Sequence, residues 1–227
     1  MAFIDESDIR KGQAVYTPFA LNIYNAWVLD VSNSWIWRCS KKIQLEQYNN
    51  HVSANHLDIG VGTGYYLQAC QSPSLSQLSL MDLNQNCLNT TFNVLKKRQL
   101  SPTTYLADIF KSQPFLAEQF NSISMNYLLH CLPGTMKAKE ICLANATAML
   151  ASGGILFGAT ILSDEELQTK ASKFLAKIYN KKGIFCNQND KLETLHEVLK
   201  NQLVDVDISV IGCVALFKGK RISNIST

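Results

Sequence analysis

The sequence predicts an α/β fold in which helices cover both faces of a mostly parallel sheet. Apolar runs of strand length alternate with amphipathic helical patterns along the chain. The 227 residues, of which 47% are hydrophobic, suffice for one full core. A glycine-rich turn follows the first apolar run within His56–Gly64, as in folds of this class that bind a nucleoside there. We therefore expect a single α/β domain with its ligand site after the first strand.

Apolar runs bounded by turn residues give the expected strands. We expect seven strands over residues 56–59, 78–82, 103–107, 120–126, 155–162, 204–211 and 214–217. The run at 155–162 follows Gly153 and Gly154 and is apolar throughout, which is typical of a strand buried on both faces. The last two strands are close enough to form a hairpin around Gly212.

Helices are expected between the later strands. Helical spacing of apolar residues predicts helices over 88–95, 141–148, 167–178 and 192–203. In the second of these, Ile141, Ala144 and Ala148 are expected to share the face that packs on the core. Ser163 and Glu166 are expected to form the capping box of the third helix, whose buried stripe would include Phe174.

The glycines of the first turn limit the choice of ligand. Gly60, Gly62 and Gly64 can adopt positive φ and lack Cβ, so the backbone can lie against a ligand. The dinucleotide pattern GxGxxG would need a glycine where this chain has Tyr65, and no GxxxxGK follows. A nicotinamide-dependent oxidoreductase is therefore disfavoured, and a glycine-rich turn without a ligand is the other alternative.

A carboxylate ends the second predicted strand. Asp82 lies about 20 residues past the glycines, where it can accept hydrogen bonds from both hydroxyls of a ribose. This spacing does not distinguish one nucleoside cofactor from another. The structural alternative is that Asp82 caps the next helix.

In this order the elements resemble the class I S-adenosylmethionine (SAM)-dependent methyltransferases. Asp58–Gly64 looks like their motif I, and Asn126–Gly134 stands where motif IV and its loop are expected. Residues 15–20, 24–27, 37–39 and 129–134 are similar to the small-molecule "type 12" methyltransferases of bacteria and fungi. The resemblance implies a Rossmann-like sheet with a late antiparallel strand, SAM as methyl donor, S-adenosylhomocysteine as product and no metal. The acceptor would be a small molecule methylated on oxygen or nitrogen.

The resemblance also implies roles for individual residues. The expected cofactor-binding residues are Asp58, Gly60, Gly62, Gly64, Asp82, Leu83, Asp108, Ile109 and Asn126. Asp108 would hydrogen-bond the adenine amino group, the alternative being an aspartate of a surface turn. His130 is the candidate general base because imidazole titrates near neutrality, and Tyr127 is the second catalytic candidate. A core or helix-capping histidine is the alternative for His130.

The segment before the glycine turn is rich in aromatic residues. By resemblance, residues 1–45 would form an N-terminal helical lid over a SAM-binding domain of residues 46–227. Tyr16, Tyr24, Trp27 and Trp37 would then contact the acceptor. Plain packing on the sheet is the alternative, because Tyr16 and Trp27 recur near helical spacing together with Ala20, Ile23 and Val31.

Composition disfavours several other functions. The net charge of +3 comes from scattered basic residues, and no Pro-Pro-Tyr follows Asn126, so we expect no nucleic-acid partner. No uncharged apolar run reaches about 20 residues, so we expect no membrane partner. Seven cysteines without a Cys-x-x-Cys pair, and an acidic start without a signal peptide, favour the cytoplasm. A monomer and a homodimer both stay open, as does a non-catalytic SAM-binding protein.

Overall fold

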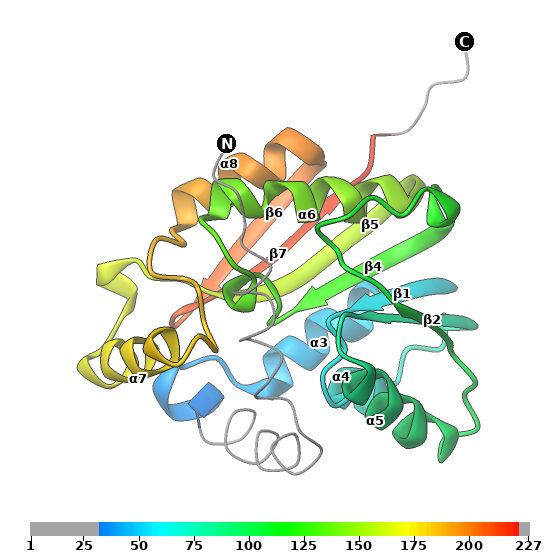
Figure 1. The fold of residues 1–227 in the computed structure, drawn as a ribbon, viewed down its shortest axis with the longest axis horizontal. Coiled ribbons are helices and arrows are strands. Elements are labelled where there is room, and N and C mark those ends of the chain that lie inside the picture. Colours follow the sequence, from blue (N-terminus) through cyan, green and yellow to red (C-terminus); the bar gives the residue numbers. More distant parts are fainter. Residues whose placement is uncertain (1–31, 223–227) are drawn as a thin grey trace.

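The computed structural model describes residues 32–222, which form one seven-stranded sheet with helices on both faces (Figure 1). The strands are β1 (Asn55–Ile59), β2 (Gln77–Asp82), β3 (Thr103–Leu106), β4 (Phe120–Asn126), β5 (Leu150–Ile161), β6 (Val204–Ile211) and β7 (Val214–Lys220). Their order in the sheet is β3-β2-β1-β4-β5-β7-β6. The first five are parallel, and β7 runs antiparallel to both β5 and β6. The predicted fold class and late antiparallel strand are thus confirmed.

Helices pack on both faces of this sheet. They are α3 (Lys41–His51), α4 (Tyr65–Ala69), α5 (Gln85–Lys96), α6 (Met136–Met149), α7 (Lys170–Lys181) and α8 (Leu192–Gln202). In Figure 1, α6 and α8 lie on one side of the sheet, whereas α3, α4 and α5 lie on the other. The strand order reverses between β1 and β4, so a crevice opens at their carboxyl ends, where ligands of such folds bind.

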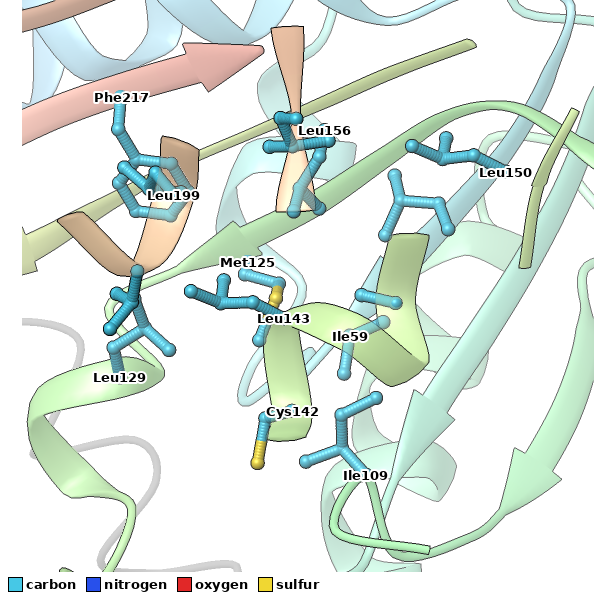
Figure 2. Close-up of a cluster of buried hydrophobic side chains, with 14 of the residues drawn as sticks. Ile59, Ile109, Met125, Leu129, Cys142, Leu143, Leu150, Leu156, Leu199 and Phe217 are labelled. Carbon is cyan, nitrogen blue, oxygen red and sulfur yellow. The ribbon is translucent and has the colours of Figure 1, made fainter. Parts of the chain in front are cut away.

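The main core fills the space between the sheet and the α6–α8 layer. Figure 2 shows Leu143 of α6 beside Met125 of β4, and Leu199 of α8 beside Phe217 of β7. These four side chains are fully buried. A second buried cluster, which includes Tyr48, Leu80 and Leu88, lies on the opposite face. Packing on both faces fixes the strands whose ends carry the candidate site.

The predicted buried face of α6 is wrong. Ile141 is 48% exposed, Ala148 is also exposed and Ala144 is half-buried. The buried residues are instead Cys142, Leu143 and Ala146. The buried face also contains the fully buried side chain of Lys139, which forms an ion pair with Asp190. A charged residue in the core is invisible to a count of apolar spacing, and the predicted stripe was therefore misplaced around the helix.

Two element boundaries also differ from prediction. The capping box of α7 is formed by Thr169 and Ser172, not by Ser163 and Glu166, and Phe174 is exposed. Ser163 instead donates its backbone N–H and hydroxyl to the carbonyl of Asp190. Strand β5 begins at residue 150, because the chain passes Gly153 and Gly154 as an irregularity in the ladder with β4.

Candidate active site

The glycine-rich turn connects β1 to α4 at the crevice. Gly60, Gly62 and Gly64 have φ of 74°, 53° and 74°, so all three use the left-handed region that glycine tolerates. A Cβ on Gly60 would lie 2.8 Å from Leu128 Cδ1, and one on Gly64 would lie 2.7 Å from Thr91 Cγ2. A Cβ on Gly62 would meet no atom within 4 Å. Close packing against Leu128 and Thr91 thus explains why Gly60 and Gly64 have no side chain. No such contact explains Gly62, whose backbone lines the cavity described below.

A cavity of about 190 Å³ opens beside this turn. All of the residues expected to bind the cofactor line it, namely Asp58, Gly60, Gly62, Gly64, Asp82, Leu83, Asp108, Ile109 and Asn126. They come from the ends of β1, β2, β3 and β4, which are neighbours in the sheet. The structure therefore brings the whole predicted set into one place.

Asp82 lies at the end of β2 and does not cap the next helix. The N-cap of α5 is Asn84, whose side chain accepts a hydrogen bond from the backbone N–H of Asn86. Asp82 Oδ1 accepts from the backbone N–H of Asn84 at 2.8 Å. Burial raises the pKa of Asp82 to about 6, against the lowering effect of nearby backbone N–H groups that include those of Asn84 and Gly62. Asp82 is therefore not the cap of α5, and it is one of the residues that line the cavity.

The ends of β3 and β4 supply two further polar side chains. Asp108 Oδ1 accepts from the backbone N–H of Phe110 at 3.0 Å, which fixes the turn after β3. Asn126 is 9% exposed, and its Nδ2 has no hydrogen-bond partner in the described part of the chain. A buried amide donor without a partner is costly, so a ligand acceptor at this point would satisfy it.

Tyr127 follows Asn126 and also lines the cavity. Its φ of 55° is unusual for a residue with a side chain, and its backbone N–H donates to the Ala159 carbonyl at 2.8 Å. Its hydroxyl accepts from Gln44 Nε2 at 2.6 Å. Gln44 Oε1 in turn accepts from the hydroxyl of Tyr66, which lines the cavity from α4.

His130, the predicted general base, lies behind the cavity wall and is not among its lining residues. Its side chain is buried, Nδ1 accepts from the backbone N–H of Ile161 at 3.3 Å, and its ring packs edge-on against Phe185 at 4.5 Å. Burial, with a smaller contribution from the charge of Lys139, lowers its pKa to about 3. These observations disfavour proton abstraction near neutral pH and favour the alternative of a core histidine.

Beneath the glycine turn, Asp58 belongs to a buried polar network whose other members were not predicted from the sequence to be functional. Tyr48 donates to Asp58 Oδ2 at 2.8 Å, and its hydroxyl lies 3.1 Å from His56 Nε2. His56 Nδ1 lies 2.8 Å from Ser122 Oγ, and Nε2 lies 3.2 Å from Ser124 Oγ. Burial lowers the pKa of His56 to about 3, so its ring is neutral here. The signal in the sequence was the pair Ser122 and Ser124, two residues apart and therefore on one face of β4.

The predicted aromatic contacts fall into two groups. Trp37 has no exposed surface, packs against Phe185 with ring centroids 5.9 Å apart and is not among the cavity-lining residues. The packing alternative therefore describes it better than contact with an acceptor. Tyr16, Tyr24 and Trp27 lie outside the described residues, so the lid and the division at residue 45 stay predictions.

Residues 32–222 lack two further kinds of site. No group of three or more His, Cys, Asp or Glu side chains in this range could hold a metal ion. No helix in the same range has the length and apolar character needed to span a bilayer.

The fold and the cavity define a nucleoside-binding α/β protein, and comparisons with known proteins narrow this class. A family model described as a methyltransferase domain matches residues 57–158. The chain is 34% identical to demethylluteothin O-methyltransferase of Streptomyces thioluteus, over 94% of this chain and 92% of that protein. It is 35% identical to the physcion biosynthesis cluster O-methyltransferase of Aspergillus chevalieri, over 93% of this chain and 95% of that protein.

Solved structures agree on the fold. An O-methyltransferase family protein from Burkholderia thailandensis superposes with a TM-score of 0.70 at 17% identity, covering 99% of this chain and 64% of that one. N-methyltransferase NodS from Bradyrhizobium japonicum WM9, in complex with S-adenosyl-L-homocysteine, gives a TM-score of 0.57 at 18% identity, covering 95% and 97%. The chain belongs to the class I SAM-dependent methyltransferases. The oxidoreductase and non-catalytic alternatives are not favoured.

Proposed function

We propose that this methyltransferase transfers the methyl group of SAM to a hydroxyl oxygen of a small, largely apolar molecule. The observation that carries the proposal is the convergence of the bare Gly62 backbone, Asp82, Asp108 and Asn126 on one cavity. The remaining wall includes apolar side chains suited to an apolar acceptor, among them Phe110, Leu128, Leu132, Pro133 and Ile184. The names of both relatives described above also favour oxygen as the methylated atom.

The residues present fit SAM, and we assign them roles in holding it. The turn at Gly60, Gly62 and Gly64 would take the nucleoside against bare backbone, with Asp58 beneath it. Asp82 would accept from the ribose hydroxyls, and Asp108 from the adenine amino group between Leu83 and Ile109. Asn126 Nδ2, which lacks a partner in the described residues, would donate to the ligand.

When bound, SAM supplies a methyl group on a sulfonium; the acceptor oxygen forms the new bond to carbon and the sulfur keeps the electron pair of the broken bond. The protein's contribution is to align the acceptor and exclude water, since the leaving thioether is uncharged. The described lining of the cavity contains neither histidine nor lysine. We therefore propose that acceptors give up their proton to water rather than to a side chain.

We further propose that the protein acts in the cytoplasm, without a metal and without a nucleic-acid or membrane partner. All seven cysteines are free thiols, which suits a reducing compartment. The acceptor is a small molecule, and the protein acts as a monomer or a homodimer.

The test is a transfer assay with methyl-labelled SAM. Matched panels of aromatic alcohols, amines and thiols are incubated with the protein, and products are identified by mass spectrometry. We expect label on oxygen for at least one aromatic alcohol and a slower reaction with its amine and thiol analogues. Label only on nitrogen or sulfur would contradict O-methylation, and SAM binding without transfer to any panel member would favour the non-catalytic alternative.

A further inference from the structure

The connection between α7 and α8, residues 182–191, contributes one residue to the cavity. Among the described lining residues, Ile184 alone comes after β5 in the chain, and the others lie between residues 58 and 133. Ile184 is half-buried, and its backbone N–H donates to the Tyr179 carbonyl at 2.9 Å. A residue far in sequence from the cofactor-binding turns thus borders the cavity.

The connection is fixed directly after Ile184. The backbone N–H of Cys186 donates to the His130 carbonyl at 2.8 Å, and the Cys186 carbonyl accepts from Lys139 Nζ at 2.7 Å. Lys139 and Asp190, which form an ion pair, are both buried. Buried hydrogen bonds to a charged group are costly to break, so we expect Ile184 to yield little when a ligand presses against it.

The same contacts place the connection at the ends of β4 and β5. His130 follows β4, and Asn187 Nδ2 donates at 3.0 Å to the carbonyl of Ile161, the last residue of β5. In the sheet order β3-β2-β1-β4-β5, these ends lie across β1 from Asp82 and Asp108, which end β2 and follow β3. Because the proposed nucleoside site includes both aspartates, the side of β4 and β5 is left for the methyl acceptor.

The wall on this side is apolar. Leu132 and Pro133, from the loop after β4, line the cavity as Ile184 does. The side chain of isoleucine has no polar atom, so it selects an acceptor by shape alone. Its branched Cβ also restricts χ1, which makes it stiffer than leucine or methionine. A stiff side chain on a fixed connection is suited to limit the size of the acceptor.

We propose that Ile184 is a specificity-determining residue, which sets the greatest length of an aromatic alcohol that fits beside the cofactor. This inference rests on the proposed O-methylation. An acceptor should bind about fourfold more tightly for each methylene group that it buries, until its chain reaches Ile184. A longer acceptor must displace a stiff side chain on an anchored connection, and its affinity therefore falls.

The test measures how affinity depends on chain length in a series of phenols from 4-methylphenol to 4-hexylphenol. Each phenol is titrated calorimetrically into full-length protein saturated with S-adenosylhomocysteine, so no methyl transfer takes place. For the wild type we expect affinity to rise with chain length and then to drop. In Ile184→Ala the drop should move to a longer chain, and the first phenol beyond the wild-type limit should bind about tenfold more tightly. In Ile184→Phe the drop should move to a shorter chain.

Ile211→Ala is the matched control. Ile211 ends β6, is half-buried and packs against the same buried cluster as Ile184, a cluster that includes Trp37, Ile161 and Phe185. Ile211 is not among the described cavity-lining residues. Its replacement should lower stability much as Ile184→Ala does, but should leave the drop at the wild-type chain length. All variants should keep the wild-type affinity for S-adenosylhomocysteine.

Three results would overturn the inference. They are a wild type that binds none of the phenols or shows no drop, a drop at the same length in both Ile184 variants, and an equal shift in Ile211→Ala. Each can occur while O-methylation of another aromatic alcohol proceeds, in which case the proposed function stands. Loss of that function would appear separately, in the transfer assay.

Discussion

The hydroxyl of Tyr48 donates a 2.8 Å hydrogen bond to Oδ2 of Asp58, so the carboxyl group before the glycine turn is held from α3. Asp58 nevertheless has its pKa raised to about 7 from an ordinary 3.8, because burial outweighs the lowering effect of Tyr48 and Ser124. A carboxyl with a raised pKa stabilises the folded state most when it is protonated. This stability is complete below about pH 4 and is lost as the pH rises through about 7.

The Asp58→Asn variant tests this pH dependence. Asparagine keeps the shape and an acceptor for Tyr48 but cannot ionise. Relative to the variant, the wild type should lose stability as pH rises from about 4 to 7, by up to about 1.4 kcal/mol per pH unit. Urea unfolding at a series of pH values measures the difference, and parallel curves for the two proteins would contradict a raised pKa.

Gly62→Ala should separate ligand binding from folding. Its φ of 53° strains a side chain, yet no atom lies within 4 Å of the added Cβ, so the stability loss should be about 1 kcal/mol. Gly183 is the matched control, with φ of 68°, equally open space and a position outside the cavity-lining residues. Both alanine variants should lose similar stability, and only Gly62→Ala should bind S-adenosylhomocysteine at least about tenfold more weakly. Equal affinities would mean that the Gly62 backbone does not contact the cofactor.

His130→Asn addresses the disfavoured general base. An asparagine oxygen can replace Nδ1 as acceptor for the Ile161 N–H, and we expect turnover per folded molecule to be retained near neutral pH. Because the folded pKa of His130 is about 3, against an ordinary 6.5, its contribution to stability is present above about pH 6.5 and is lost on acidification. For each pH unit of acidification below that pH, the free energy of unfolding of the variant should therefore fall by about 1.4 kcal/mol less than that of the wild type. A turnover number lowered a hundredfold, with unchanged stability, would restore the catalytic assignment.

The buried ion pair between Lys139 and Asp190 ties α6 to the segment that packs behind His130. Lys139 Nζ lies 2.6 Å from Asp190 Oδ2 and donates to the Cys186 carbonyl at 2.7 Å. Lys139→Met leaves the Asp190 carboxylate without its partner, and the free energy of unfolding should fall by about 3–5 kcal/mol. The double variant Lys139→Met/Asp190→Leu should recover much of this loss. Chemical denaturation of the single and double variants measures these changes. If the loss in the double variant equals the sum of the losses in the two single variants, the two residues are not coupled.

The sequence predicted the strands better than the faces of the helices. A strand buried on both faces is a continuous apolar run, so most of β5 stands out in the sequence. The hairpin around Gly212 is also visible in the sequence. The wrong face of α6 was predicted to be buried, because Lys139 lies in the core. Its charge is paired there with Asp190, 51 residues away, and the local spacing of apolar residues cannot reveal such a partner. The start of α7 was misplaced because the Asp190 carbonyl binds Ser163, a contact that is likewise distant in sequence.

The candidate site shows the same division. Residues at strand ends could be predicted, because parallel strands bring their carboxyl ends together. Gln44 and Tyr48 could not, since both come from a helix that precedes every strand and reach the site only through the packing of α3 on the sheet. His130 follows a strand and was a reasonable candidate, but its burial depends on Phe185, a residue far along the chain.

The central claim is that the carboxyl ends of β1 to β4 form the SAM site, and the most direct test is calorimetric titration with S-adenosylhomocysteine. The wild type should bind one equivalent, and Asp82→Ala should bind about ten- to a hundredfold more weakly, because hydrogen bonds to a charged acceptor are lost. Asp108→Ala should have a smaller effect, and Asp207→Ala, on the exposed edge strand β6, none. Absence of binding to the wild type, or unchanged affinity in a folded Asp82→Ala protein, would contradict the account.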